Sequence, residues 1–167
     1  MKTFFWLFER YPDAKAALRE LLEAGIDAEE VNAMIAVKTA KEVMDVNWEK
    51  ADVHVTDEIG KQRLTGLDAL LAREQPVSTP DADEIYAAGK VATIAGKTAS
   101  SAMREPHGLL GALEDLNVPE PAARAFVEGL GRGGVLLWVR AEDELAVSIS
   151  DTLQGQQADI SASYTLG

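Results

Sequence analysis

Two segments of the chain, one near each end, carry apolar side chains on both faces of an extended strand. They are residues 2–9 (KTFFWLFE) and residues 133–140 (GGVLLWVR). A strand that is apolar on both faces is typical of the centre of a sheet covered on both sides, whereas strict alternation is typical of a strand with one wet face. The pattern therefore predicts that these two segments are the central strands of one sheet.

A helical pattern and a second extended segment follow the first central strand. Residues 14–22 place apolar side chains three and four positions apart, in a helix that Pro12 opens and Gly25 closes. Residues 31–38 (VNAMIAVK) then predict a strand. Because this strand is less apolar on one side, it is a candidate edge strand.

The same order of elements recurs near the other end of the chain. Leu145, Ile149 and Leu153 indicate a helix, and residues 158–166 alternate almost perfectly between apolar and polar side chains, as an edge strand does. Two β-α-β halves of this kind predict an α+β fold. The expected sheet is ferredoxin-like, four-stranded and antiparallel, with the first and third strands central and helices on one face.

The second face of such a sheet needs a cover of its own, because large apolar side chains would otherwise lie in water. Either the middle of the chain or a second copy of the protein must supply it. The residues that we predict to form an interface or a pocket on this face are Phe4, Trp6, Phe8, Leu136 and Trp138.

The middle of the chain is less regular, and we predict a single domain in which residues 39–116 form a helical insertion between sheet halves at 1–38 and 117–167. A leucine stripe from Leu64 to Leu71 indicates one helix, and two prolines favour a loop at residues 75–80. A second helix is expected at about residues 83–104, because its small apolar residues share one face.

The composition restricts the classes of partner. Acidic residues number 28 against 16 Lys plus Arg in 167 residues, a formal net charge of −12. A surface of this sign repels phosphate backbones and anionic lipids, so we expect neither nucleic acid nor a membrane among the partners. The chain has no cysteine, no signal peptide pattern and no apolar run of about 20 residues, and a cytoplasmic location is therefore expected.

Two segments of the chain together resemble the heat-induced general stress protein domain of bacteria. They are residues 4–26 (FFWLFERYPDAKAALRELLEAGI) and residues 111–141 (GALEDLNVPEPAARAFVEGLGRGGVLLWVRA). The resemblance implies a Gly- and Ala-rich hydrophobic hairpin between the sheet halves and no assigned molecular activity. The corresponding residues 64–103 carry charged side chains here. We therefore expect the hairpin to be a packing element rather than a membrane segment.

Two glycine motifs resemble phosphate-binding sequences but stand in the wrong context. Gly129, Gly131 and Gly134 satisfy G-x-G-x-x-G, yet they close a helix and open a strand, whereas dinucleotide binding needs the reverse order. The Gly-Lys-Thr at residues 96–98 lies inside a helical pattern, with Val91 where a phosphate-binding loop needs glycine. We interpret both as structural and predict no cofactor.

The most metal-like cluster is formed by Asp52, His54, Asp57 and Glu58. It lacks a second histidine, and neighbouring carboxylates are expected by chance in so acidic a chain, which favours a solvated loop. We assign no metal site. No G-x-S-x-G pattern and no distinguishable pair of carboxylates indicates a catalytic centre, so no catalytic residue is predicted.

Three functional hypotheses follow from these patterns. The first is a non-enzymatic, stress-associated protein of unassigned molecular activity that forms a homodimer or higher oligomer through the second sheet face or the insertion. The alternative is a small-molecule-binding or sensor module with an apolar pocket between the sheet and the insertion, around Trp6 and Trp138. A metal-dependent enzyme built on Asp52, His54 and Asp57 is the least favoured hypothesis.

Overall fold

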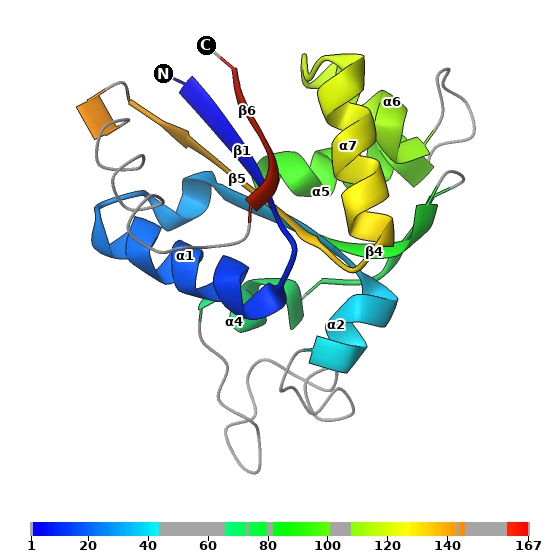
Figure 1. Cartoon of the computed structure of the whole chain (residues 1–167), viewed down its shortest axis with the longest axis horizontal. Helices are drawn as coiled ribbons and strands as arrows, with labels where there is room; N and C mark the ends of the chain where they lie inside the picture. Colours follow the sequence, from blue (N-terminus) through cyan, green and yellow to red (C-terminus); the bar gives the residue numbers. More distant parts are fainter. Residues whose placement is uncertain are drawn as a thin grey trace.

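A computed structural model describes residues 2–43, 66–72, 74–79, 82–100, 108–142, 144–145 and 160–166. Its helices and strands follow one another in the order shown in Figure 1. They are β1 (Lys2–Phe8), α1 (Tyr11–Glu23), the short 3₁₀ helix η1 (Ala28–Glu30), β2 (Val31–Ala36), α2 (Val37–Val43), α4 (Gly66–Ala72), β3 (Val77–Thr79), β4 (Ala82–Ala88), α5 (Lys90–Ser100), α6 (Gly108–Asp115), α7 (Glu120–Gly131), β5 (Val135–Ala141) and β6 (Ile160–Leu166).

The strands form a six-stranded sheet in the order β3-β4-β2-β5-β1-β6, and the neighbouring strands pair antiparallel. The prediction that β1 and β5 are central is confirmed, since β1 lies between β5 and β6 and β5 lies between β2 and β1. The β6 strand is at one edge, as its alternating pattern predicts. The fold is therefore α+β, with a sheet of six strands rather than four.

The prediction that residues 31–38 form an edge strand is wrong. The strand β2 ends at Ala36, all its residues are buried, and it lies between β5 and β4. Its second neighbour, β4, comes from the segment that we predicted to be a helical insertion. Because the insertion adds β3 and β4 to the sheet, β2 is covered along both edges.

The predicted helix at residues 83–104 divides into a strand and a shorter helix. Residues 82–88 form β4, and α5 begins at Lys90, directly after Gly89. Gly89 has a φ of +106°, a backbone conformation that ends the strand and starts the helix in one residue. The expected loop at residues 75–80 contains β3, whereas α4 confirms a helix at the described end of the leucine stripe.

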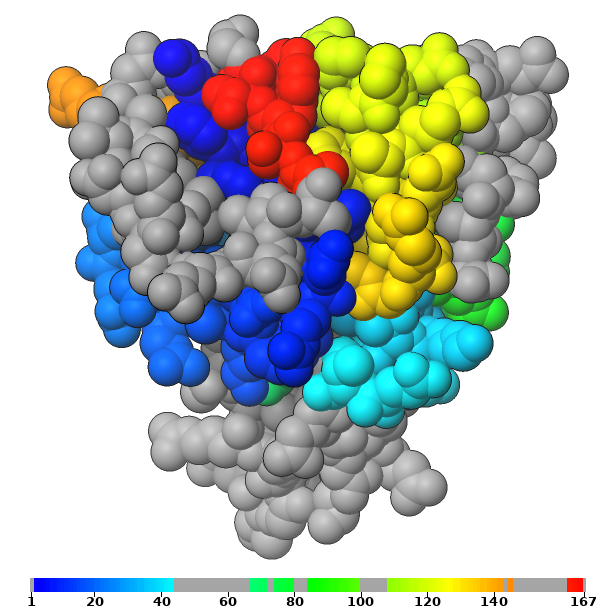
Figure 2. All heavy atoms as spheres, viewed as in Figure 1, coloured from blue at the N-terminus to red at the C-terminus, as the bar shows by residue number. Residues whose placement is uncertain are grey.

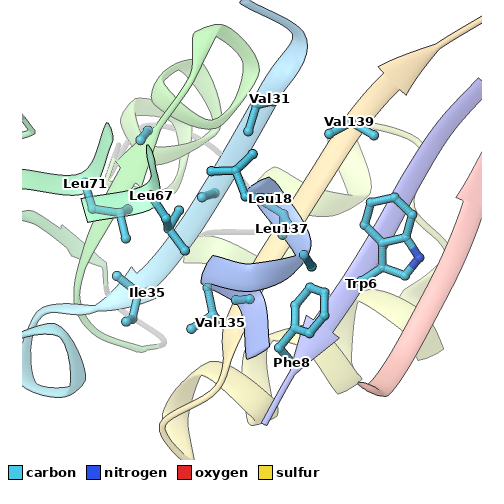
Figure 3. Packing of buried hydrophobic residues seen from close by; sticks show 14 of the residues in the cluster. Trp6, Phe8, Leu18, Val31, Ile35, Leu67, Leu71, Val135, Leu137 and Val139 are labelled. Atoms are coloured by element: carbon cyan, nitrogen blue, oxygen red, sulfur yellow. The ribbon is translucent and has the colours of Figure 1, made fainter. Parts of the chain in front are cut away.

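Helices cover both faces of the sheet, and the expectation that the middle of the chain could cover the second face is confirmed by α5 and α6. The helices α1 and α4 pack on one face, and α5, α6 and α7 pack on the other (Figure 1). Two separate apolar cores result, because alternate residues of each central strand point to opposite faces. Figure 3 shows the first core, where Leu18 of α1 and Leu67 of α4 lie over side chains from β1, β2 and β5.

The glycine pattern before β5 forms a helix end and a turn, as predicted. The helix α7 ends at Gly131, Gly133 has a φ of +96°, and β5 begins at Val135. A Cβ atom on Gly129 would lie 2.0 Å from Cδ2 of Leu7, so α7 approaches β1 more closely than any larger residue allows. The motif therefore serves close packing of α7 on the sheet.

Candidate functional site

The five residues predicted to form an interface or pocket lie on two faces instead of one. Phe4, Trp6 and Phe8 belong to the core under α1, whereas Leu136 and Trp138 belong to the core under α5, α6 and α7. The register explains the difference. The strand β5 places Trp138 opposite Phe5 and Leu136 opposite Leu7, and directly opposed residues point to the same face.

All five side chains are buried within the chain itself. Phe4 is the most exposed of them at 8%, and Leu136 and Phe8 are fully buried. The second sheet face therefore has an internal cover, in which α5 and α6 come from the insertion. A second copy of the protein is not needed to keep these rings out of water.

A pocket of about 320 Å³ lies at one end of the face covered by α5, α6 and α7. Most of the residues that line it stand in two successive rows across the strands β2, β5, β1 and β6. The lining residues are Thr3, Phe5, Glu30, Asn32, Val91, Leu116, Trp138, Arg140 and Leu166. The pocket therefore lies between the sheet and the helices, with Trp138 in its lining and Trp6 on the opposite face of the sheet.

The inner row of the pocket contains two aromatic residues beside Asn32. Phe5 of β1 is the register partner of Trp138 of β5, and their rings stack with centroids 5.4 Å apart and an angle of 22° between the planes. The ring of Phe126 of α7 also stacks with Phe5, with centroids 5.9 Å apart. Both Phe5 and Trp138 are 1% exposed, so the rings are packed into the core and only a small part of each is open to the pocket.

The outer row is polar and nearer to solvent. Thr3 of β1 is the register partner of Arg140 of β5, and Leu166 of β6 is the partner of Thr3 on its other side. Glu30 directly precedes Val31, which pairs with Val139. Continuation of this register places Glu30 beside Arg140, so the outer row carries one carboxylate, one guanidinium and one hydroxyl group.

The buried Asn32 joins this end of the sheet to the start of α5. Its Oδ1 atom accepts hydrogen bonds from the backbone N–H groups of Val91 and Ala92, each at 2.9 Å. These donors belong to the first turn of α5, where helices leave N–H groups without internal partners. Since Asn32 already satisfies both groups, the start of α5 offers no anion-binding site to the pocket.

A second polar cluster lies on the opposite face, between α1 and α4. The Tyr11 hydroxyl group donates a hydrogen bond to Oδ1 of Asp68, and Nζ of Lys15 lies 2.6 Å from Oδ2 of the same carboxylate. Burial raises the pKa of Tyr11 above its ordinary value, and the hydrogen bond to Asp68 and the charge of Asp68 raise it further. A phenol held in its protonated form cannot act as a base. We therefore interpret the cluster as structural, because its hydrogen bond and its ion pair both join α1 to α4.

The remaining candidates receive no support as sites. Asp52, His54, Asp57 and Glu58 lie outside the described residues. Within the described part of the chain, no group of three or more His, Cys, Asp and Glu side chains is placed to hold a metal ion. The Gly-Lys-Thr sequence at residues 96–98 lies inside α5, as predicted. Among the helices that the structure describes, none has the length and apolar character needed to cross a membrane.

Comparison of the chain with protein-family models, curated proteins and solved structures finds no match. The resemblance to the heat-induced general stress protein domain therefore stays a prediction. The pocket geometry is the stronger basis for a functional proposal.

The sequence patterns pointed to Trp138 as a pocket residue but not to most of the other residues that line the pocket. The alternation of side chains along the two central strands contained a usable signal. Thr3 and Phe5 are alternate residues of one strand, and Trp138 and Arg140 are alternate residues of the other, so the two members of each pair point to the same face. Each pair combines a polar outer residue with an aromatic inner one. Only the register between the strands shows that the two pairs meet on one face.

Proposed function

We propose that this protein is a small-molecule-binding module whose ligand lies between the sheet and the helices α5, α6 and α7. The observation that carries the proposal is the pocket with a stacked Phe5–Trp138 floor and a polar outer row. Ligand sites typically combine an apolar, largely preformed lining with a few polar groups that fix orientation. The pocket volume of about 320 Å³ is near the lower end of the ~300–1,000 Å³ usual for such sites, which favours a small ligand.

We propose that this pocket binds its ligand without catalysing a reaction. In the described chain the pocket contains no histidine and no cysteine, and its titratable side chains are Glu30 and Arg140. A guanidinium group stays protonated under working conditions and does not exchange a proton with a substrate. One carboxylate on a partly exposed rim is a poor basis for paired acid and base chemistry.

Tryptophan fluorescence offers a direct test, because Trp138 lines the pocket and Trp6 lies on the opposite face. Titration with a panel of small apolar metabolites should change the emission of the protein for at least one compound. Trp138→Phe should remove most of that change, whereas Trp6→Phe, the matched control, should retain it. Native mass spectrometry of the purified protein should show the corresponding added mass. A response that depends on Trp6 and not on Trp138, or no response to any compound, would overturn the proposal.

Self-association is a second candidate function, and the edge strand β6 favours it. Among the described strands β6 pairs with β1 alone, and its sequence ISASYTL contains neither a charged residue nor a proline. Figure 2 shows β6 at the surface, between β1 and the helices α6 and α7. Natural sheets usually protect a long edge with charge or proline, and an edge without them can pair with a second copy.

The edge hypothesis is tested by the subunit count. We expect light scattering after size-exclusion chromatography to give a dimer or higher oligomer of the wild-type chain. Ser163→Lys should shift it to a monomer, because the exposed Ser163 of β6 would then bring like charges together at the edge. Ser163→Thr is the matched control and should leave the oligomer intact. A wild-type monomer across the accessible concentration range would contradict this candidate.

We further propose that β1, β2, β5 and β6 form a ferredoxin-like core to which β3 and β4 are added. The order β2-β5-β1-β6 supports this proposal, because it is the order expected when the first and third of four strands are central. The association with stress is proposed only on the sequence resemblance. Its test is whether the amount of this protein in its source cells rises after a shift to higher temperature.

A further inference from the structure

We propose that the pocket takes a free apolar amino acid in its zwitterionic form. This inference rests on the proposed function and specifies the ligand class for the same site. The side chain of the amino acid would lie on the ring floor of Phe5 and Trp138. Its α-carboxylate and α-ammonium groups would lie against the polar outer row.

The charges of the outer row carry the first step of the argument. Glu30 and Arg140 have opposite charges and line the same pocket, and neither forms an ion pair within the described chain. A ligand with a single negative charge would be attracted to Arg140 and repelled by Glu30, and a cation would meet the reverse. A ligand that carries both charges a few ångströms apart is complementary to both residues.

The hydroxyl group of Thr3 helps to orient the carboxylate group of the ligand. Thr3 and Arg140 are register partners, so the hydroxyl donor and the guanidinium donors lie side by side on adjacent strands. A carboxylate accepts several hydrogen bonds at once, and guanidinium groups bind carboxylates in a forked geometry. The carboxylate is therefore expected between Thr3 and Arg140, with the ammonium group toward Glu30.

The walls of the pocket select an apolar side chain on the ligand. Val91 of α5, Leu116 after α6 and Leu166 of β6 line the same pocket as Phe5 and Trp138. Asn32, the polar residue of the inner row, uses its Oδ1 atom to cap α5. A polar ligand side chain would lose its hydrogen bonds to water on entering and would find few partners.

A set of four phenyl compounds tests the inference by isothermal titration calorimetry on the full chain. They are L-phenylalanine, phenethylamine, which lacks the carboxylate, 3-phenylpropionate, which lacks the ammonium group, and ethylbenzene, which lacks both. We expect L-phenylalanine to bind at least about tenfold more tightly than either singly charged analogue, because hydrogen bonds to charged groups are the stronger ones.

Two charge-neutralising variants show which protein group recognises which end of the ligand. Arg140→Gln should weaken the binding of L-phenylalanine and 3-phenylpropionate at least about tenfold. It should not weaken the binding of phenethylamine, whose ammonium group is no longer repelled by the guanidinium group. Glu30→Gln should weaken the binding of L-phenylalanine and phenethylamine. It should not weaken the binding of 3-phenylpropionate, whose carboxylate is no longer repelled by Glu30. Lys97→Gln, an exposed charge change on α5 away from the pocket, is the control and should alter none of the affinities.

The outcomes separate this inference from the proposed function. Equal affinities for the four compounds, or tightest binding of a singly charged one, would overturn the amino acid as ligand and leave a binding module in place. If no phenyl compound binds and the apolar metabolite panel also leaves the Trp138 fluorescence unchanged, the proposed function itself fails. Selective binding of the zwitterion that both variants weaken would support the inference.

Discussion

The Oδ1 atom of Asn32 lies 2.9 Å from the backbone nitrogen of Ala92, 60 positions further along the chain. A residue of β2 thus caps a helix that belongs to the insertion, in the way that a local residue normally caps its own helix. The same oxygen also accepts the N–H of Val91. The position of α5 over the pocket therefore depends on one buried amide group.

Asn32→Ala should lower the free energy of unfolding by about 1–3 kcal/mol, because it leaves two N–H groups without their acceptor in a buried site. Urea denaturation followed by circular dichroism measures this change. Asn32→Asp keeps an acceptor that the helix dipole favours, and we expect it to be less destabilised than the alanine variant at neutral pH. Wild-type stability of Asn32→Ala would show that the cap contributes nothing.

Gly89→Ala should be more destabilising than Gly25→Ala, although both glycines have nearly the same φ, +106° and +104°. The positive φ alone costs about 1–2 kcal/mol for a residue with a Cβ atom. A Cβ on Gly89 would also lie 2.3 Å from the backbone oxygen of Val31, whereas a Cβ on Gly25 would have no atom within 4 Å. We expect the clash to add ~1–3 kcal/mol in denaturant unfolding. Equal effects of the two substitutions would contradict close packing at Gly89.

Gly129→Ala should destabilise the protein, and Gly131→Ala should be neutral or slightly stabilising. A Cβ on Gly129 would lie 2.0 Å from Cδ2 of the buried Leu7, whereas the same atom on Gly131 would meet nothing within 4 Å. Overpacking costs ~1–3 kcal/mol, while alanine is favoured over glycine in a helix by about 1 kcal/mol. Melting temperatures of the two variants, measured side by side, decide the sign. If the motif bound a phosphate instead, both changes would alter ligand affinity more than stability.

Tyr11→Phe should lower stability at pH 7 by about 1.5–3 kcal/mol, because the buried Asp68 carboxylate loses a hydrogen-bond donor. The raised pKa of Tyr11 gives this difference a pH dependence. Above about pH 10 an unfolded tyrosine loses its proton, whereas the folded Tyr11 retains it, so the wild type loses stability as the pH rises. The loss is at most about 1.4 kcal/mol per pH unit.

The variant has no phenol at this position, and the stability gap between it and the wild type should therefore narrow between pH 9.5 and about 11. Urea unfolding midpoints measured through this window provide the comparison. A gap that stays constant up to about pH 11 would show that Tyr11 titrates alike in the folded and unfolded chains.

The central position of β1 and β5 could be predicted from the sequence because apolar side chains on both faces admit few other placements. The helix α1 also followed from periodicity, with Pro12 at its start. These elements are determined by residues close together in the chain. Local pattern was sufficient for them.

The strand β4 shows where local pattern fails. Residues 82–88 contain small apolar residues that suit a helix equally well, and their strand conformation depends on pairing with β2, some 50 positions earlier. Local pattern also could not predict the candidate pocket, because Phe5 and Trp138 come together only through the β1–β5 register. A shift of one residue in that register would move Trp138 to the other face.

Neighbouring residues of β1 serve different cores, since Phe5 belongs to the layer under α7 and Trp6 to the layer under α1. Neither layer can therefore detach without disturbing the strand on which both depend. We expect heat to unfold the sheet and both helical layers in a single cooperative transition. No stable intermediate should form in which one set of helices has separated from the sheet.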